Sequence, residues 1–235
     1  LLVNNTSGSG TGYGNVVVWA GATLGGTGTI APGADTGVSN GLWVQSGATL
    51  IVGAVGSTSA SQLHVTLNST GSFGPTFDAG IGSVIAGDQA FVNLDAGSIL
   101  KLNLFLNQAS TTTTEADRLV FQDIGSVSQI TITGATLNVG IGAGSSLVST
   151  NFNVGDSWQL IDWGGLTPTG KFANLTGSTS TDFIDLPTLS GGKFWDISNL
   201  YTSGIIVVAV PEPGRLLLLL LGVLALGWRR RRRLA

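Results

Sequence analysis

Four short segments of the chain share one pattern: a glycine and a small residue, followed by a threonine or isoleucine and then a leucine. They are Gly21-Ala22-Thr23-Leu24, Gly47-Ala48-Thr49-Leu50, Gly97-Ser98-Ile99-Leu100 and Gly134-Ala135-Thr136-Leu137. Each follows an apolar run of strand character. A glycine can adopt a positive φ at a corner, and the next residues then restart an extended run whose leucine points inward. The pattern predicts strands that meet at repeated tight corners.

Other strands are predicted wherever short apolar or alternating runs lie between Gly, Asn, Ser and Asp residues. The predicted strands are Asn15–Trp19, Leu42–Gln45, Thr49–Val52, Gln62–Leu67, Phe91–Leu94, Ile99–Phe105, Arg118–Phe121, Gln129–Thr133, Thr136–Val139, Trp158–Asp162 and Gly204–Ala209. No segment before Leu216 keeps a helical apolar period long enough to predict a helix. Irregularly spaced corners are typical of a β-solenoid. We therefore predict an all-β body, a right-handed parallel β-helix, with a β-sandwich as the alternative.

The composition agrees with this class. Charged residues make up 10% of the chain and 36 residues are glycine, which suits short strands and tight turns. The chain has no cysteine, so disulfides and thiolate metal sites are excluded. Residues 1–210 carry twelve acidic against four basic side chains, a net charge of −8. A body of this charge argues against nucleic acid as a partner, because phosphate binding needs clustered Lys and Arg.

The C-terminal end combines an apolar segment with a cationic cluster. Leu216–Trp228 holds no polar side chain, and five arginines follow it, Arg229, Arg230, Arg231, Arg232 and Arg233. This order predicts a single transmembrane helix with the arginines on the cytoplasmic side and the body outside the cytoplasm. Thirteen residues make about 20 Å of helix, less than the hydrocarbon core of a bilayer. The predicted anchor is therefore a temporary one.

The chain divides accordingly into three parts. We predict a β-solenoid body over residues 1–200, an extended linker over 201–214, and the membrane helix with its basic tail over 215–235. The linker contains two prolines, Pro211 and Pro213, which lack an N–H group and hold the chain extended. An extended peptide of this kind is accessible to a processing enzyme.

The tripartite order resembles the C-terminus of PEP-CTERM proteins. The resemblance rests on Val210-Pro211-Glu212-Pro213, the leucine-rich segment and the arginine cluster. It implies export to the envelope of a Gram-negative bacterium, membrane anchoring with the C-terminus in the cytoplasm, and processing by an exosortase-type enzyme near the Pro-Glu-Pro motif. It also implies a final place at the cell surface or in the extracellular matrix, with exopolysaccharide as an expected partner.

The N-terminal end resembles a second family. Leu2-Val3-Asn4-Asn5-Thr6, the segment from Gly21 to Ile30, and Pro32-Gly33 are similar to the autotransporter-associated β-strand repeat. Proteins with that repeat are secreted β-helices, and the resemblance implies that further coils precede Leu1.

Side chains suited to chemistry are scattered. The aspartates lie mostly beside Gly, Ser or Asn, where turn hydrogen bonds or solvent are the expected roles. His64 is the single histidine and is expected on the outer side of a strand, so no catalytic residue, cofactor site or metal site is predicted.

Five tryptophans precede the apolar segment, and they are open to two interpretations, core residues or a platform on which sugars stack. They are Trp19, Trp43, Trp158, Trp163 and Trp195.

These observations lead to one expected function and one alternative. We expect an exported, non-enzymatic structural or adhesive protein of the cell surface or biofilm matrix. The alternative is an extracellular polysaccharide lyase or glycosidase on the same scaffold. A pair of carboxyl groups facing one groove beside aromatic side chains would favour the enzyme.

Overall fold

A computed structural model covers the chain and describes residues 1–12, 14–32, 40–53, 59–67, 90–105, 116–123, 128–143, 145, 147–148, 150–173 and 184–211. Within these ranges every regular element is a β-strand. The predicted membrane segment Leu216–Trp228 and the arginine cluster Arg229–Arg233 lie outside the described residues. No helix that could cross a bilayer occurs in the described part.

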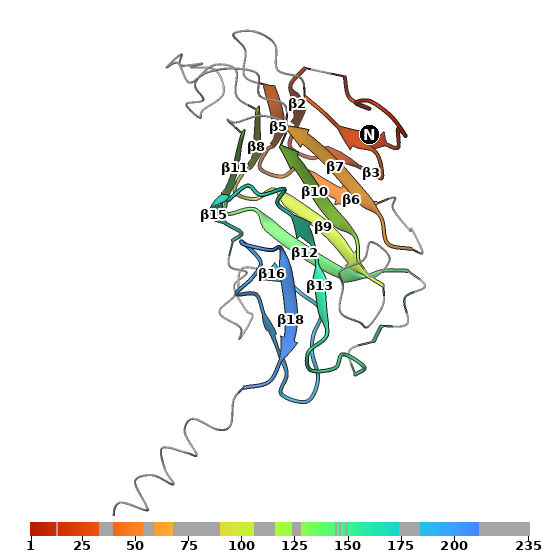
Figure 1. Cartoon of the computed structure of the whole chain (residues 1–235), viewed down its shortest axis with the longest axis vertical. Helices are drawn as coiled ribbons and strands as arrows, with labels where there is room; N and C mark the ends of the chain where they lie inside the picture. Colours follow the sequence, from red (N-terminus) through yellow and green to blue (C-terminus); the bar gives the residue numbers. More distant parts are fainter. Residues whose placement is uncertain are drawn as a thin grey trace, which may run out of the picture.

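Three parallel sheets form the body, and the chain visits them in a repeating order (Figure 1). Sheet 1 contains β1 (Leu2–Val3), β3 (Thr23–Gly26), β6 (Thr49–Val52), β9 (Ile99–Leu104), β12 (Thr136–Ile141) and β16 (Ile184–Asp185). Sheet 2 contains β2 (Val16–Val18), β5 (Asn40–Val44), β8 (Ala90–Leu94), β11 (Ser128–Thr133) and β15 (Thr169–Lys171). Sheet 3 contains β4 (Thr29–Ile30), β7 (Gln62–Leu67), β10 (Arg118–Asp123) and β14 (Ile161–Asp162).

Successive strands pass from sheet 2 to sheet 1 to sheet 3 and back to sheet 2 one coil further on. Each strand therefore pairs in parallel with the strand one coil away rather than with its neighbour in sequence, as in β5 with β8 and β8 with β11. This connectivity is that of a β-helix-like body. It agrees with the predicted parallel solenoid and excludes the alternative of an antiparallel sandwich for this part of the chain.

The four glycine repeats form the corners between sheets 2 and 1. Gly21, Gly47, Gly97 and Gly134 have φ values of 78°, 77°, 81° and 89°, the left-handed region that glycine tolerates best. The residues after them are in register, with Leu24 opposite Leu50, Leu50 opposite Leu100 and Leu100 opposite Leu137. All four leucines are buried. The predicted inward leucine column is confirmed.

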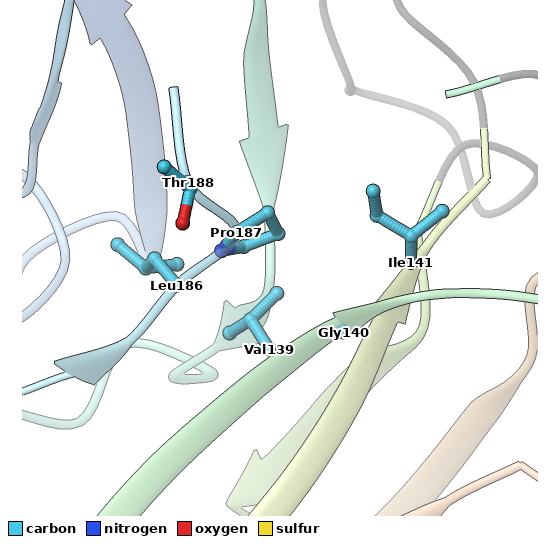
Figure 2. Close-up of a pocket in the computed structure, with 6 residues that line it drawn as sticks. All are labelled: Val139, Gly140, Ile141, Leu186, Pro187 and Thr188. Carbon is cyan, nitrogen blue, oxygen red and sulfur yellow. The ribbon is translucent and has the colours of Figure 1, made fainter. Parts of the chain in front are cut away.

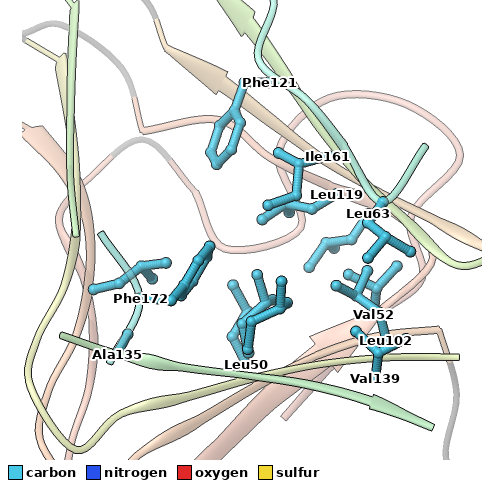
Figure 3. Close-up of a cluster of buried hydrophobic side chains, with 14 of the residues drawn as sticks. Leu50, Val52, Leu63, Leu102, Leu119, Phe121, Ala135, Val139, Ile161 and Phe172 are labelled. Atoms are coloured by element: carbon cyan, nitrogen blue, oxygen red, sulfur yellow. The ribbon is translucent and has the colours of Figure 1, made fainter. Parts of the chain in front are cut away.

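Alternation along each strand fills the interior. In β7 the side chains of Leu63, Val65 and Leu67 are buried, and the alternate residues Gln62, His64 and Thr66 lie on the outer side. Side chains from sheet 1 and sheet 3 meet in the middle of the coil, as Figure 3 shows for Leu50, Leu119 and their neighbours. Buried side chains of sheet 2 belong to the same hydrophobic cluster. Burial of one such leucine stabilises the fold by about 1.5–3 kcal/mol.

A small antiparallel sheet closes the C-terminal end of the solenoid. It contains β13 (Ser157–Gln159), β17 (Phe194–Asp196) and β18 (Ile205–Ala209), with β18 in the centre. The single strand predicted over Trp158–Asp162 is in fact two, because β13 joins this cap whereas β14 pairs with β10 in sheet 3. The chain changes sheet at Leu160, whose N–H bonds to the carbonyl of Gly204 at 2.9 Å.

Aromatic side chains join the cap to the coils. Phe152, Trp158 and Trp195 pack edge to face, with ring centroids 5.4–5.7 Å apart. Trp163 stacks on Phe121 of β10 at 5.7 Å, and its indole N–H donates to the carbonyl of Leu200 at 2.8 Å. The solenoid and the cap therefore share one continuous core. Strand β18 lies within the predicted linker 201–214, and it belongs to this core.

Candidate functional site

The last described strand, β18, is held on both edges. It pairs antiparallel with β13, where Trp158 lies opposite Ile206, and with β17, where Trp195 lies opposite Val208. Ile206 and Val208 are buried. The N–H of Val208 also donates to the carbonyl of Asp156 at 2.8 Å. The chain thus leaves the body from a central strand, which cannot peel away without breaking two rows of backbone hydrogen bonds.

The strand ends where its sequence becomes unsuited to a ladder. Val210 is 43% exposed and Pro211 is exposed. Proline lacks the N–H that a central strand would need, so pairing stops before it. In Figure 1 the blue arrow of β18 points away from the coils toward one tip of the body. Of the predicted processing motif, Val210 and Pro211 lie at this exit, and Glu212 and Pro213 lie outside the described residues.

Residues 209–232 match the PEP-CTERM protein-sorting motif. The match begins at Ala209, the last residue of β18, and so starts where the rigid body ends. It confirms the resemblance predicted for this end of the chain. The motif implies export, association with the membrane of a Gram-negative envelope, and processing by an exosortase-type enzyme.

Comparison with curated proteins and with solved structures gives no match to the chain. The similarity of residues 2–33 to the autotransporter-associated repeat stays a prediction. In the structure the described residues of that stretch form β1, β2, β3 and β4, the strands at one end of the solenoid.

Three aspartates hold turns, the role expected from their neighbours in sequence. Asp156 accepts a hydrogen bond from the N–H of Asn153 at 2.6 Å. Asp162 accepts from Gly164 at 3.1 Å, and Asp196 accepts from Ser198 at 2.9 Å. Side-chain oxygens of this kind replace backbone partners in tight turns. Asp185 instead accepts a hydrogen bond from the side-chain amide of Asn138 on the outer face of sheet 1.

Asp117 departs from the expected turn or solvated role. Its side chain is only 1% exposed, between the end of β9 and the start of β10. It accepts hydrogen bonds from the N–H of Ser61 at 2.9 Å, the N–H of Asn103 at 3.0 Å and the side-chain amide of Asn103 at 2.8 Å. Burial raises the pKa of Asp117 to about 6, and these three hydrogen bonds oppose the rise. This buried carboxyl group therefore connects neighbouring coils through its hydrogen bonds, and a substrate cannot reach it.

His64 lies half-buried on the outer side of β7, between the buried Leu63 and Val65. On that face Val120 of β10 lies opposite His64, and Arg118 lies opposite Gln62. In the amide orientation that satisfies both partners, Gln62 donates to Nε2 of His64 at 3.3 Å and accepts from Nε of Arg118 at 3.1 Å. Among the described residues, no three His, Asp or Glu side chains gather closely enough to hold a metal ion.

An apolar hollow of about 440 Å³ lies beside the end of β12 (Figure 2). Val139, Gly140 and Ile141 line one side, and Leu186, Pro187 and Thr188 line the other. None of these six residues is ionisable. The hollow therefore supplies no acid or base for catalysis from the residues that line it.

The tryptophans divide between the two interpretations left open by the sequence. Trp158, Trp163 and Trp195 are buried and form the core of the cap and the last coil. Trp43 is half-buried on the outer side of sheet 2, and Trp19, which follows β2 directly, is 65% exposed. Alternation alone does not distinguish the inner from the outer face of an isolated strand, so the sequence could not make this division.

Proposed function

We propose that the protein is an exosortase substrate whose β-solenoid body acts as a non-enzymatic structural or adhesive element at the cell surface or in a biofilm matrix. The observation that carries the proposal is the position of the sorting motif. It begins at Ala209, the end of a central strand fixed to both neighbours. Val210 and Pro211 are exposed, so a processing enzyme can reach the start of the motif while the body remains folded.

The membrane step is part of the same proposal. Leu216–Trp228 inserts as a short helix, Arg229–Arg233 stay on the cytoplasmic side, and cleavage near Pro211-Glu212-Pro213 releases the body. The short apolar length supports a temporary anchor rather than a permanent one. Outside the membrane, the coil, which we expect to be right-handed, is a rod in which every strand between the two ends pairs with a neighbour on both sides.

The carboxylates support a non-enzymatic body. Asp156, Asp162 and Asp196 serve turns, and Asp117 is enclosed. An inverting or retaining glycosidase needs two carboxyl groups about 5–10 Å apart facing the same substrate. These four aspartates support structural roles instead.

The proposal is tested by following the protein in cells with and without an active exosortase-type enzyme. The chain, including its C-terminal segment, is expressed behind a secretory signal and detected by antibodies against its body. We expect a processed form at the cell surface only where the enzyme is present. Glu212→Ala should leave the larger, membrane-bound form, because it removes the one acidic side chain of the motif.

Glu115→Ala is the matched control, because it removes the only other glutamate in the chain and lies outside the motif. This variant should be processed like the wild type. Identical membrane-bound protein in both strains, or equal processing of Glu212→Ala and the wild type, would contradict the proposal.

A further inference from the structure

Three consecutive corners of the solenoid carry side chains at equivalent positions. Trp19, Gln45 and Asp95 each open the turn between sheet 2 and sheet 1. Their carbonyls accept hydrogen bonds from Ala22, Ala48 and Ser98 at 2.8, 2.9 and 3.0 Å. Because the preceding residues Val18, Val44 and Leu94 point into the core, these three side chains point outward. Neighbouring strands lie about 4.8 Å apart, so the three side chains form one column on the surface.

Trp43 lies in the adjoining column of sheet 2, two residues before Gln45 and on the same face. Its indole N–H donates a hydrogen bond to Oδ2 of Asp95 at 2.7 Å. This bond fixes the ring across the surface toward the next coil. We call Trp19, Trp43, Gln45 and Asp95 the indole patch.

The patch combines two kinds of recognition surface. Trp19 is 65% exposed and offers a broad apolar ring, and Trp43 offers a second ring with a fixed orientation. Gln45, which lies between Trp19 and Asp95 in the column, can donate and accept hydrogen bonds, and the carboxylate of Asp95 accepts them. Rigid aromatic rings with a few placed polar groups are typical of small-molecule and sugar sites.

These groups match the chemistry of a pyranose ring. The C–H face of such a sugar is apolar and flat enough to stack on an indole, and its rim of hydroxyl groups can donate to Asp95 and bond to Gln45. Charge restricts the choice further, because residues 1–210 carry a net charge of −8 and Asp95 lies within the patch. An anionic chain would meet repulsion from both.

We propose that the indole patch binds a neutral pyranose polysaccharide. The inference deepens the proposed function, and rests on it only for placing this face outside the cell. Binding itself can be measured on purified protein. Processing in cells and binding in solution are therefore separate results, and either can fail while the other holds.

The test uses the full-length chain in polyoxyethylene detergent micelles, since detergents with sugar headgroups would compete. The protein is sedimented with three insoluble neutral polysaccharides, amorphous cellulose, curdlan and mannan, and with alginate gel as an anionic comparison. We expect saturable binding to at least one neutral polysaccharide, with little change between low and high salt. Trp19→Ala should weaken that binding at least fivefold without lowering the melting temperature, because its ring is exposed.

Phe194→Ala is the matched control, because it removes an exposed aromatic ring from the cap rather than from the patch. It should bind as the wild type does. The proposal is overturned by binding to none of the three neutral polysaccharides, by stronger binding to alginate, or by an equal loss in Phe194→Ala. It is also overturned if light scattering finds self-association that Trp19→Ala abolishes while no polysaccharide binds.

Discussion

The side-chain amide of Asn103 donates a 2.8 Å hydrogen bond to Oδ2 of Asp117, and the N–H of Asp117 donates to the carbonyl of Asn103 at 2.8 Å. The other carboxyl oxygen accepts from the N–H of Ser61, just before β7. One buried carboxyl group therefore ties β9 and β10 of its own coil to the coil before it.

This carboxyl group should make stability depend on pH in an identifiable window. Burial raises the pKa of Asp117 from 3.8 to about 6, so the folded state binds the proton more tightly than the unfolded state. Its contribution to the unfolding free energy should rise as the pH falls from 7 through 6 toward 4, by up to about 3 kcal/mol. The measurement is urea unfolding at several pH values.

Asp117→Asn separates the pH dependence caused by Asp117 from that caused by the other acidic side chains. The variant cannot titrate at position 117, whereas the other acidic side chains still titrate. The difference in unfolding free energy between wild type and variant should change across pH 4–7. A constant difference across that range would contradict the assignment.

Replacing Ser98 at its glycine-repeat corner should make the protein more stable. Its hydroxyl is buried and has no hydrogen-bond partner among the described residues, whereas the equivalent corners carry the buried alanines Ala48 and Ala135. Leaving a buried hydroxyl unpaired costs about 1–3 kcal/mol. Ser98→Ala should therefore raise the unfolding free energy by about 1 kcal/mol, measured in urea. Ala48→Ser, the reverse change one coil earlier, should lower it by a similar amount, and destabilisation by Ser98→Ala would refute this explanation.

Entry into β18 depends on the absence of a side chain at Gly204. This residue has φ +71°, and a Cβ atom there would lie 1.6 Å from the carbonyl oxygen of Ile161. Gly204→Ala should lower the unfolding free energy by at least about 3 kcal/mol, since the left-handed conformation and the overlap both act against it.

Gly155 provides the matched control for Gly204. Its φ is +93°, and a Cβ atom there would meet nothing within 4 Å. Gly155→Ala should therefore cost only the conformational term, about 1–2 kcal/mol. Thermal unfolding of both variants measures the difference, and equal losses would show that the close approach to Ile161 is not what requires glycine.

Much of the solenoid follows from local sequence. Thr49–Val52 and Gln62–Leu67 are predicted with the bounds that the structure gives them. Gly53 follows the first strand, and the second lies between Ser61 and Asn68 with polar and apolar residues in alternation. The glycine corners also indicate which leucines lie in register. Two-residue strands such as β4 and β16 escape prediction, because so short a run has no detectable alternation and its pairing is set by the neighbouring coil.

The candidate sites likewise include features that the sequence predicts and contacts that it does not. Pro211, Glu212 and the arginine cluster are readable because their order along the chain is itself the signal, and no distant contact is needed. The bond from Trp43 to Asp95 joins residues 52 positions apart, and the bond from Ser61 to Asp117 joins residues 56 positions apart. Such pairs meet only through the stacking of coils whose lengths differ, so a single sequence gives no means of placing them together.

The most direct test of the account is the intact mass of the mature protein purified from cells with an active exosortase-type enzyme. We predict a chain that ends near Pro211-Glu212-Pro213 and has lost Arg229–Arg233. A mature protein that still carries these five arginines would contradict the central claim that the C-terminal segment is a sorting signal removed from the end of β18.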